Sequence, residues 1–453
     1  MAFYKIYPLK VPKGNWSYPN KINNNQFTVG RCGTKAILWK PNGNFQLLNL
    51  PGTSSEAISL NSSQNVVGTL DDQAFLWQQS TGVTTLLKGF NGQIANAIAN
   101  GINDFNQITG TIPLLNTFRY VPALWNTANA IPINLFAGLK QRVGGLEGGH
   151  GKDINNHGLV VGDRRDAASP SFYQSYIWEN NKYTTFLNQK NILDIPTYGL
   201  YAVNDLQKPQ IVGHAQFVDP GSYFDLKPIL YDAKTTLLQI LAIPGEEGHA
   251  NDINNNGDAV GTINTKFQGI GSVPLSAALW IFNGQVRINL NHPSVSDAHA
   301  NGWQLVGAKS INNNGYIVGS GFLNGDKKTL LPWLLKPIIP VHRIPIEYML
   351  PQALWPGEGY DKPPPRRWPL KFPFPIPSPN PFQIVGNGFT HLNNILISKN
   401  VKETINTMSD SNARKKIQAI ADQTIREEMK KLKTILTNHS SPVKKDEKKD
   451  NMN

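Results

Sequence analysis

Two loops of the sequence carry residue types that could hold a ligand or move protons. The stretches EGGHGKDIN and EGHANDIN each place a histidine four residues before an aliphatic residue and an aspartate directly before it. These residues are His150 and Asp153 in the first loop, and His249 and Asp252 in the second. Imidazole and carboxylate groups can transfer protons and can hydrogen-bond the hydroxyl or amine groups of a ligand. If the loops are equivalent parts of a repeat, both histidines project from one face, and we predict a ligand site there.

A third histidine, His299, lies beside Trp303 in the loop SDAHANGWQ, at a different offset from the next aliphatic residue. We include Trp303 in the predicted ligand site. Two or three such histidines could bind a metal ion, but no HxxxH or HExxH spacing supports this. We therefore predict no metal and no cofactor. The structural alternative is that these loops only hydrogen-bond to their own turns.

Signatures of known enzyme classes are absent from the sequence, which contains no GxSxG motif, no P-loop and no strand-to-helix GxGxxG. The single cysteine, Cys32, follows Gly30 with no histidine nearby in the sequence, so a nucleophilic role is disfavoured. One cysteine also excludes a disulfide framework and any CxxC zinc or redox motif. The sequence favours a noncatalytic protein over an enzyme. The alternative is a glycan hydrolase or lyase that uses the four loop residues named above.

One phrase recurs seven times along the first three quarters of the chain. The copies read INNNQFTVG from Ile22, LNSSQNVVG from Leu60, INDFNQITG from Ile102, INNHGLVVG from Ile154, VNDLQKPQIVG from Val203, INNNGDAVG from Ile253 and INNNGYIVG from Ile311. Each is followed after 9 to 19 residues by an aromatic residue that closes a short apolar run, such as KAILW or QAFLW. Short apolar runs bounded by Asn and Gly are typical of strands and hairpins. Together with a further apolar run, each unit predicts four antiparallel strands.

Seven such units predict an all-β fold, a seven-bladed β-propeller with repeats of about 40–55 residues. The composition agrees, because 49 Asn, 39 Gly and 32 Pro favour turns. A strand-like segment at residues 3–9 precedes the first phrase, whereas the last unit reaches only its third strand at Trp333. We expect the N-terminal strand to complete the last blade and close the ring. An open solenoid and two sandwiches are disfavoured by the irregular spacing and by the equivalence of the copies.

The residue after each aliphatic is an asparagine in all seven copies: Asn23, Asn61, Asn103, Asn155, Asn204, Asn254 and Asn312. We predict that these side chains form Asx turns with their own hairpins. Calcium binding is the alternative, but the phrase offers amides and few carboxylates. The aromatic residue of each third strand is predicted to pack within its blade rather than to serve as a sugar platform.

The phrase pattern AxxINxxGxVVG, followed by a run like AFLW and often preceded by a loop like Leu50-Pro51-Gly52, resembles the HAF-repeat proteins. The nearest match to the His-Ala-Phe tripeptide of that family is Gln73-Ala74-Phe75, which lacks the histidine. The resemblance covers residues 1–337. It implies a propeller-like repeat protein, often labelled extracellular, with no established chemistry.

Charge and hydropathy bear on partners and location. The net charge is +12, but residues after Pro337 hold 18 Lys and Arg against 11 Asp and Glu, so the first 337 residues carry only +5. A weakly charged body without a basic stripe is a poor nucleic-acid surface. We expect no membrane span, because the most apolar run, LLPWLLKPIIPV, is broken by Lys336 and by prolines. The start, MAFYKIYPLKVPKGNW, has no signal-peptide core, so the localisation stays open between cytoplasmic and non-classical secretion.

The chain changes character after the repeats. Residues 1–337 form the predicted propeller and residues 338–398 a Pro-rich extended segment, with 14 Pro between Pro337 and Pro381. Within residues 399–438 an apolar stripe from Ile417 to Leu436 predicts an amphipathic C-terminal α-helix that docks on a partner or on the same chain. Residues 439–453 are predicted to be a disordered charged tail.

From the sequence we predict a noncatalytic binding or scaffolding propeller that holds a protein, peptide or glycan on a loop face. The alternatives are the glycan-acting enzyme described above and a structural component of a surface layer or particle. The identity of the ligand does not follow from the sequence.

Overall fold

The computed structural model describes residues 2–338 except residues 14, 114–119, 138–147, 166–172, 187–196, 219–223, 243–245, 266–274, 282 and 285. All of them belong to one compact unit, Met1–Tyr360. The predicted Pro-rich segment beyond residue 338, the amphipathic helix and the charged tail lie outside the described residues. Those parts of the interpretation therefore remain predictions.

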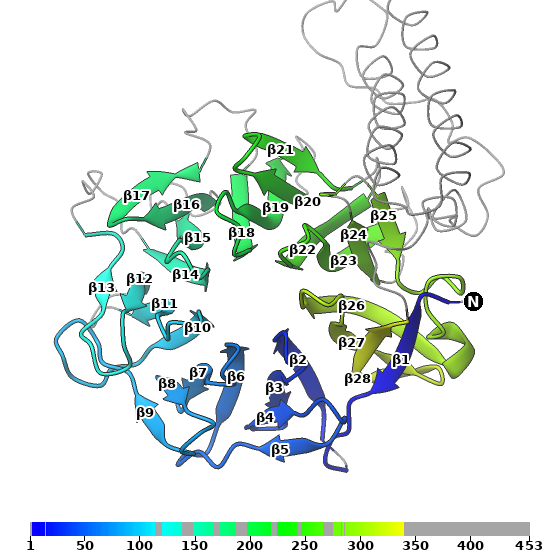
Figure 1. Ribbon diagram of the computed structural model, residues 1–453, viewed down its shortest axis with the longest axis horizontal. Coiled ribbons are helices and arrows are strands. Elements are labelled where there is room, and N and C mark those ends of the chain that lie inside the picture. Colours follow the sequence, from blue (N-terminus) through cyan, green and yellow to red (C-terminus); the bar gives the residue numbers. More distant parts are fainter. Residues whose placement is uncertain are drawn as a thin grey trace, which may run out of the picture. The chain divides into compact units, whose positions relative to one another are not determined.

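Seven four-stranded antiparallel sheets surround a common axis (Figure 1), which confirms the predicted seven-bladed propeller. Blades 1 and 2 consist of β2 (Ser17–Ile22), β3 (Thr28–Cys32), β4 (Lys35–Trp39), β5 (Phe45–Leu47), β6 (Ser55–Leu60), β7 (Val66–Leu70), β8 (Gln73–Trp77) and β9 (Thr84–Leu86). Blades 3 and 4 consist of β10 (Ile98–Ile102), β11 (Ile108–Pro113), β12 (Tyr120–Trp125), β13 (Ile133–Asn134), β14 (Gly148–Ile154), β15 (Val160–Arg165), β16 (Tyr173–Glu179) and β17 (Lys182–Thr185). Blades 5 and 6 consist of β18 (Thr197–Val203), β19 (Gln210–Val218), β20 (Phe224–Asp232), β21 (Leu237–Ile240), β22 (Glu246–Ile253), β23 (Ala259–Thr265), β24 (Ser276–Ile281) and β25 (Val286–Asn289).

Blade 7 is completed by the N-terminal strand, as the sequence predicted. Its own strands are β26 (Trp303–Ile311), β27 (Ile317–Leu323) and β28 (Asp326–Pro337), preceded by the short 3-10 helix η2 (His299–Asn301). Strand β1 (Tyr4–Pro8) pairs antiparallel with the end of β28, from Tyr4 opposite Pro337 to Pro8 opposite Trp333. Tyr4 and Ile6 are buried in the last blade. The ring is therefore closed by chain segments from the two ends of the propeller.

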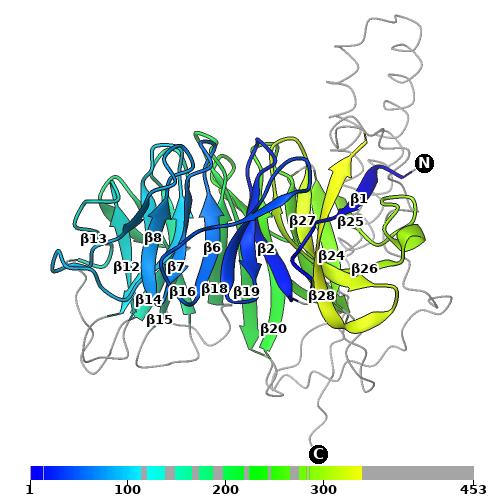
Figure 2. The same ribbon diagram turned by 90° about the horizontal axis from the view of Figure 1, so that it is seen from below.

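Each phrase forms the hairpin between the first and second strands of a blade, and the first strands lie nearest the axis (Figure 1). Seen from the edge in Figure 2, the strands stand along the axis, so the hairpin turns collect at the two ends of the ring. We call the end that carries the seven phrase turns the Asn-turn face. In six blades the fourth residue after the aliphatic has a positive φ: Gln26, Gln64, Asn106, Gly158, Gly257 and Gly315. In blades 1 and 2 this residue is a glutamine, a type that rarely takes a positive φ.

Every innermost strand contains a β-bulge just before its last two residues. The bulge brings a backbone carbonyl of the innermost strand against the closing glycine of the phrase, where no side chain fits. A Cβ on Gly68, for example, would lie 1.9 Å from the Glu56 carbonyl oxygen, and all seven phrase glycines show an equivalent approach. This close approach explains why the phrase ends in glycine, and the bulge re-aims the side chain that follows it.

The apolar core is divided among the interfaces between successive blades. One cluster joins Val29 and Leu38 of blade 1 to Val66 and Phe75 of blade 2, and the other interfaces are built in the same way. The tryptophans that end the third strands are buried, and Trp39, Trp125 and Trp280 donate their indole N–H to backbone carbonyls. These contacts confirm the predicted packing role of the third-strand aromatics.

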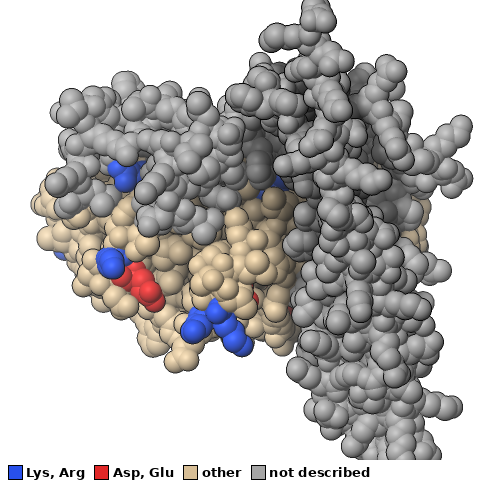
Figure 3. All heavy atoms as spheres, turned by 90° about the horizontal axis from the view of Figure 1, so that it is seen from above, with Lys and Arg blue, Asp and Glu red and all other residues tan. Residues whose placement is uncertain are grey.

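The described surface seen in Figure 3 is largely uncharged, with Lys, Arg, Asp and Glu side chains scattered over it. Among the described residues there is no helix long and apolar enough to cross a membrane.

Candidate functional site

The seven phrase asparagines link each blade to the next in a closed ring. Each Nδ2 group donates a hydrogen bond to the backbone carbonyl of the asparagine in the following blade, and Asn312 of blade 7 donates back to Asn23 of blade 1. The seven donor–acceptor distances lie between 2.9 and 3.1 Å, and all seven side chains are buried. The Asn ring is thus a structural element of the Asn-turn face.

The same asparagines also form the predicted Asx turns. In blade 4, Asn155 Oδ1 accepts the backbone N–H groups of His157 and Leu159, each at 3.0 Å. The oxygen that a calcium ion would need is therefore engaged by the hairpin itself. This use of the oxygen was predicted from the sequence. The use of the nitrogen was not, because a link between blades is not visible in a single repeat.

A second set of links uses the residue after each asparagine. The backbone N–H of Asp104, for example, donates to Asn156 Oδ1 at 2.8 Å, and that of Asn156 donates to Asp205 Oδ1 at 2.7 Å. Six of the seven interfaces have this link. The carboxylates of Asp104 and Asp205 consequently have structural partners.

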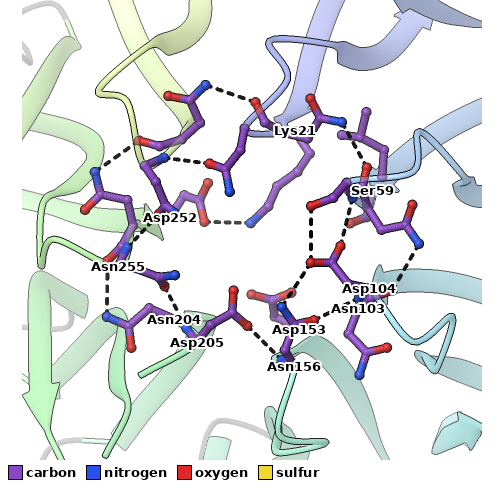
Figure 4. A pocket seen from close by; sticks show the side chains of 18 of the residues that line it. Lys21, Ser59, Asn103, Asp104, Asp153, Asn156, Asn204, Asp205, Asp252 and Asn255 are labelled. Carbon is purple, nitrogen blue, oxygen red and sulfur yellow. Dashed lines mark hydrogen bonds and ion pairs between the residues drawn. The ribbon is translucent and has the colours of Figure 1, made fainter. Parts of the chain in front are cut away.

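A pocket of about 120 Å³ opens at the axis inside the Asn ring, and all seven blades contribute to its lining (Figure 4). The residue two positions before each asparagine follows the β-bulge, and it differs from blade to blade. In blade order these residues are Lys21, Ser59, Gly101, Asp153, Ala202, Asp252 and Ser310. Four of them line the pocket: Lys21, Ser59, Asp153 and Asp252. We call this the central pocket.

Lys21 and Asp252 form an ion pair in the central pocket, with Lys21 Nζ 2.7 Å from Asp252 Oδ1. The Asp252 side chain is almost fully buried, and its second oxygen accepts hydrogen bonds from the Ser310 hydroxyl and the Ile311 N–H. Burial opposes the charge on Lys21, but the carboxylates of Asp252 and Asp153 outweigh it and raise the pKa of Lys21. Both oxygens of Asp252 are therefore occupied by groups of the protein.

Asp153 lies in the same pocket with fewer partners, and its side chain points inward (Figure 4). Its Oδ2 accepts the backbone N–H of Val203 at 3.1 Å. Burial, helped by the nearby Asp252 carboxylate and opposed by Lys21, raises the pKa of Asp153 to about 6. The structure thus brings Asp153 and Asp252, two of the residues named in the predicted site, into one pocket.

The two predicted histidines do not join the aspartates in this pocket. His150 lies on the same strand as Asp153 but further from the Asn-turn face, where its Nδ1 is 2.6 Å from Asp163 Oδ1. Lys152 lies 3.4 Å from the other oxygen of Asp163, and the ring of Tyr120 stacks on His150. Burial opposes the charge on Asp163, but these partners lower its pKa. The predicted grouping of two histidines with two aspartates is therefore corrected: the histidines and the aspartates lie at two different heights along the axis. A histidine three residues before the aspartate lies about 10 Å further along a strand.

At the same level as His150, a histidine of blade 5 lies close to His249 of blade 6. His214 occupies the space that a side chain at Gly199 would fill, since a Cβ there would lie 2.3 Å from His214 Cε1. The ring of Tyr201 lies 5.3 Å from that of His214 and 6.0 Å from that of His249. Burial lowers the pKa of both histidines to about 4. We call these three residues the histidine level.

Trp303 lies at the start of β26, at the end of blade 7 opposite the Asn-turn face, and it does not line the central pocket. It lines a different pocket together with His299. Among the described residues no group of three or more His, Cys, Asp or Glu side chains is arranged to hold a metal ion.

Three residues of these sites were not predicted from the sequence: Lys21, Asp163 and His214. Lys21 could have been found by comparing the residue two positions before each phrase asparagine across the seven copies. Asp163 and His214 each follow the closing glycine of a phrase directly, where a polar residue on the second strand can reach the axis.

Comparison with known proteins found solved structures that are similar to this chain at low sequence identity. No family model matches the chain, and no curated protein matches it. It is similar to the structure of an oligogalacturonate lyase from Vibrio parahaemolyticus, with TM-score 0.49 and 8% identity, covering 73% of this chain and 93% of that one. The β-propeller domain of the Trilobed protease from Pyrococcus furiosus has TM-score 0.42 and 13% identity, with 73% and 98% covered. A prolyl endopeptidase has TM-score 0.43 and 10% identity, and this chain covers only 50% of its length.

Proposed function

We propose that the protein is a noncatalytic binding or scaffolding propeller whose central pocket takes a polar group of a protein, peptide or glycan. The observation that carries this proposal is the contrast between each phrase asparagine and the residue two positions before it. The asparagines are identical and mutually bonded, whereas the residues two positions before them are chemically different and include three charged side chains at the axis. A purely structural plug would not need that variety.

The lining of the central pocket indicates the chemistry of the ligand. Four aspartates, Asp104, Asp153, Asp205 and Asp252, line it with one lysine, among amide and hydroxyl groups. This excess of acceptors and negative charge favours hydroxyl or amine groups and disfavours phosphates. A volume of about 120 Å³ holds a few water molecules or one small group, so the pocket would grip the tip of a larger ligand.

The contacts of the charged residues support a binding role rather than catalysis. Both carboxylate oxygens of Asp252 already accept hydrogen bonds from protein groups. The Ser310 hydroxyl, which donates one of them, is fully buried. The histidines that could act as acid or base lie at another level of the axis. We also propose, from the repeat phrase, a relationship to the HAF-repeat proteins.

One observation favours the second candidate, an enzyme that acts on glycans. Asp153 has a raised pKa of about 6, while Asp252 beside it is held in an ion pair. Two carboxylates in such different environments can serve as acid and base in glycosidic bond cleavage.

The test is binding of the full chain to a glycan array and to an array of peptides with free amines, using wild type and Asp153→Asn. Glu179→Gln, an exposed acid on β16, is the matched control. We expect wild type and Glu179→Gln to bind the same ligands and Asp153→Asn to lose them. Release of reducing ends from a glycan ligand, abolished by Asp153→Asn, would instead support the enzyme.

A further inference from the structure

A second pocket lies at the end of blade 7 opposite the Asn-turn face. Its volume is about 590 Å³, within the range of roughly 300–1,000 Å³ that is usual for small-molecule sites. It is lined by the start of β24, the loop after β25, helix η2, the start of β26 and the turn between β27 and β28. It shares no lining residue with the central pocket. We call it the blade 7 pocket.

The wall of the blade 7 pocket is mostly apolar and carries a few hydrogen-bonding groups. Its described lining residues include no Lys, Arg, Asp or Glu, and their hydrogen-bonding side chains are a hydroxyl, an imidazole, an indole and amides. Four of these side chains make no hydrogen bond to any other described residue: Ser276, His299, Gln304 and Asn324. Open donors and acceptors without a fixed charge suit a neutral ligand that carries several hydroxyl groups.

The base of the pocket is rigid. Trp303 is 5% exposed and packs in an apolar cluster with Val295 and Leu305. The Asn291 amide is fixed by two hydrogen bonds to the Leu305 backbone, one donated at 2.8 Å and one accepted at 2.7 Å. The wall formed by Trp303 and Asn291 is therefore ordered before any ligand binds, which reduces the entropic cost of binding.

Asn324 is held in place by a tight turn. Asn324 and Gly325 have φ values of 54° and 75°, as in a two-residue type I′ hairpin. Gly302 has a φ of 76°, and a Cβ there would lie 2.2 Å from Asn324 Oδ1. Glycine at residue 302 thus leaves the room that the Asn324 amide needs beside the pocket.

We propose that the blade 7 pocket binds a neutral sugar of one or two units. The amide, imidazole and hydroxyl groups would hydrogen-bond the sugar hydroxyls, while the indole edge of Trp303 would contact the apolar C–H face of the ring. Because the described lining residues carry no charge, they offer no ion-pair partner to sugar acids or amino sugars. This site is independent of the function proposed for the central pocket.

The experiment is saturation-transfer NMR on the full chain with glucose, galactose, mannose, fucose and N-acetylglucosamine, and with glucuronic acid and glucosamine as charged probes. The variants are Gln304→Ala and Asn324→Gly. Glycine at residue 324 keeps the positive φ of the turn. Gln93→Ala removes an exposed glutamine of blade 2 and is the matched control. Thermal melting of each variant verifies that it is folded.

We expect at least one neutral sugar to bind at millimolar concentration. Its dissociation constant should rise about fivefold in each pocket variant, as for the loss of one hydrogen bond, and stay unchanged in Gln93→Ala. Binding must also persist in Asp153→Asn, which separates this proposal from that for the central pocket. The proposal is overturned if no neutral sugar binds, if a charged probe binds more tightly, or if both pocket variants bind like wild type.

Discussion

Two residues of each blade that lie two positions apart behave in opposite ways. The phrase asparagine is the same in all seven blades, is buried, and bonds both its own turn and the next blade. The residue two positions before it changes from lysine to serine, glycine, aspartate or alanine, and lysine, serine and aspartate at this position line the central pocket. The repeated asparagines therefore stabilise the ring, whereas the variable residues at the axis are available to contact a ligand. The predictions below test this assignment of roles in order of decreasing effect.

The largest effect should come from opening the ring. Deletion of residues 1–12 removes β1 and exposes the edge of β28, and it also removes the buried side chains of Tyr4, Ile6 and Leu9. Burial of each such side chain is worth about 1.5–3 kcal/mol. We expect aggregation or loss of the cooperative thermal transition, measured by size-exclusion chromatography and calorimetry. Lys5→Ala, at an exposed residue of β1, should behave like wild type, and a stable monomeric deletion variant would contradict closure by this strand.

The next effect compares Asn155 with Asp153, which lies two positions before it in blade 4. Asn155→Ala removes two accepted hydrogen bonds and the link to Asn204, leaving the buried N–H of Leu159 without a partner. We expect it to lower the free energy of unfolding by about 3 kcal/mol in urea titrations. Asp153→Asn should not lower it at pH 7.5, because it relieves a buried carboxylate. Equal losses in both variants would mean that the division between the two residues is wrong.

The histidine level should make the fold sensitive to acid. His214 and His249 have pKa values of about 4 in the fold, below the usual value of 6.5, because burial disfavours their charged form. As pH falls from 6.5 to 4 the unfolded chain gains protons that the fold does not, so stability is lost. Compared with His249→Gln, wild type should lose about 2 kcal/mol over that interval, measured by urea titration at each pH. Parallel pH profiles would show that His249 is not held neutral.

Asp153 should change the free energy of unfolding with pH less than the histidines do, and in the opposite direction. Its pKa is about 6 in the fold, above the usual 3.8, so between pH 4 and 6 the fold holds a proton that the unfolded chain has lost. Stability is then lost as pH rises through this interval and is constant above it. The difference in unfolding free energy between wild type and Asp153→Asn should fall by about 1–2 kcal/mol from pH 4 to 6.5. A difference that does not change with pH would contradict the burial of this carboxylate.

The smallest effect concerns the turn of blade 1. Gln26 has a φ of 65°, which costs a side chain about 1–2 kcal/mol, and it forms no side-chain hydrogen bond among the described residues. Gln26→Gly removes that cost but increases the entropy of the unfolded chain, so we expect a gain of about 0.5 kcal/mol. Differential scanning calorimetry would detect it. Gln78→Gly, at a residue without positive φ, should destabilise the protein.

The fold could be predicted because the information needed was repeated. Seven copies of one phrase gave the strand order of a blade, and an unpaired strand at the N-terminus indicated how the ring closes. The Asx turns were also predictable, because an Asx turn is a local interaction. The link from Asn155 to Asn204 was not, since it joins residues 49 apart in sequence whose proximity follows from the radius of the ring.

The site was predicted in part for the same reason. The sequence placed Asp153 and Asp252 at equivalent positions, and equivalent positions meet at the axis of a propeller. It could not show that His150 lies at another level, nor that His214 enters the space left by Gly199 from a different strand. The helix from Ile417 to Leu436 remains a prediction, which Ile425→Asp with Leu432→Asp would test by hydrogen exchange and size.

The most direct test of the central claim is the dissociation constant of one array-selected ligand at pH 7.5 for wild type, Asp153→Asn and Glu179→Gln. Asp153 is ionised at this pH, and a charge-assisted hydrogen bond from the ligand is worth about 1.5–3 kcal/mol. We predict binding at least about tenfold weaker for Asp153→Asn and unchanged for Glu179→Gln. Equal constants for all three proteins would contradict a ligand site in the central pocket.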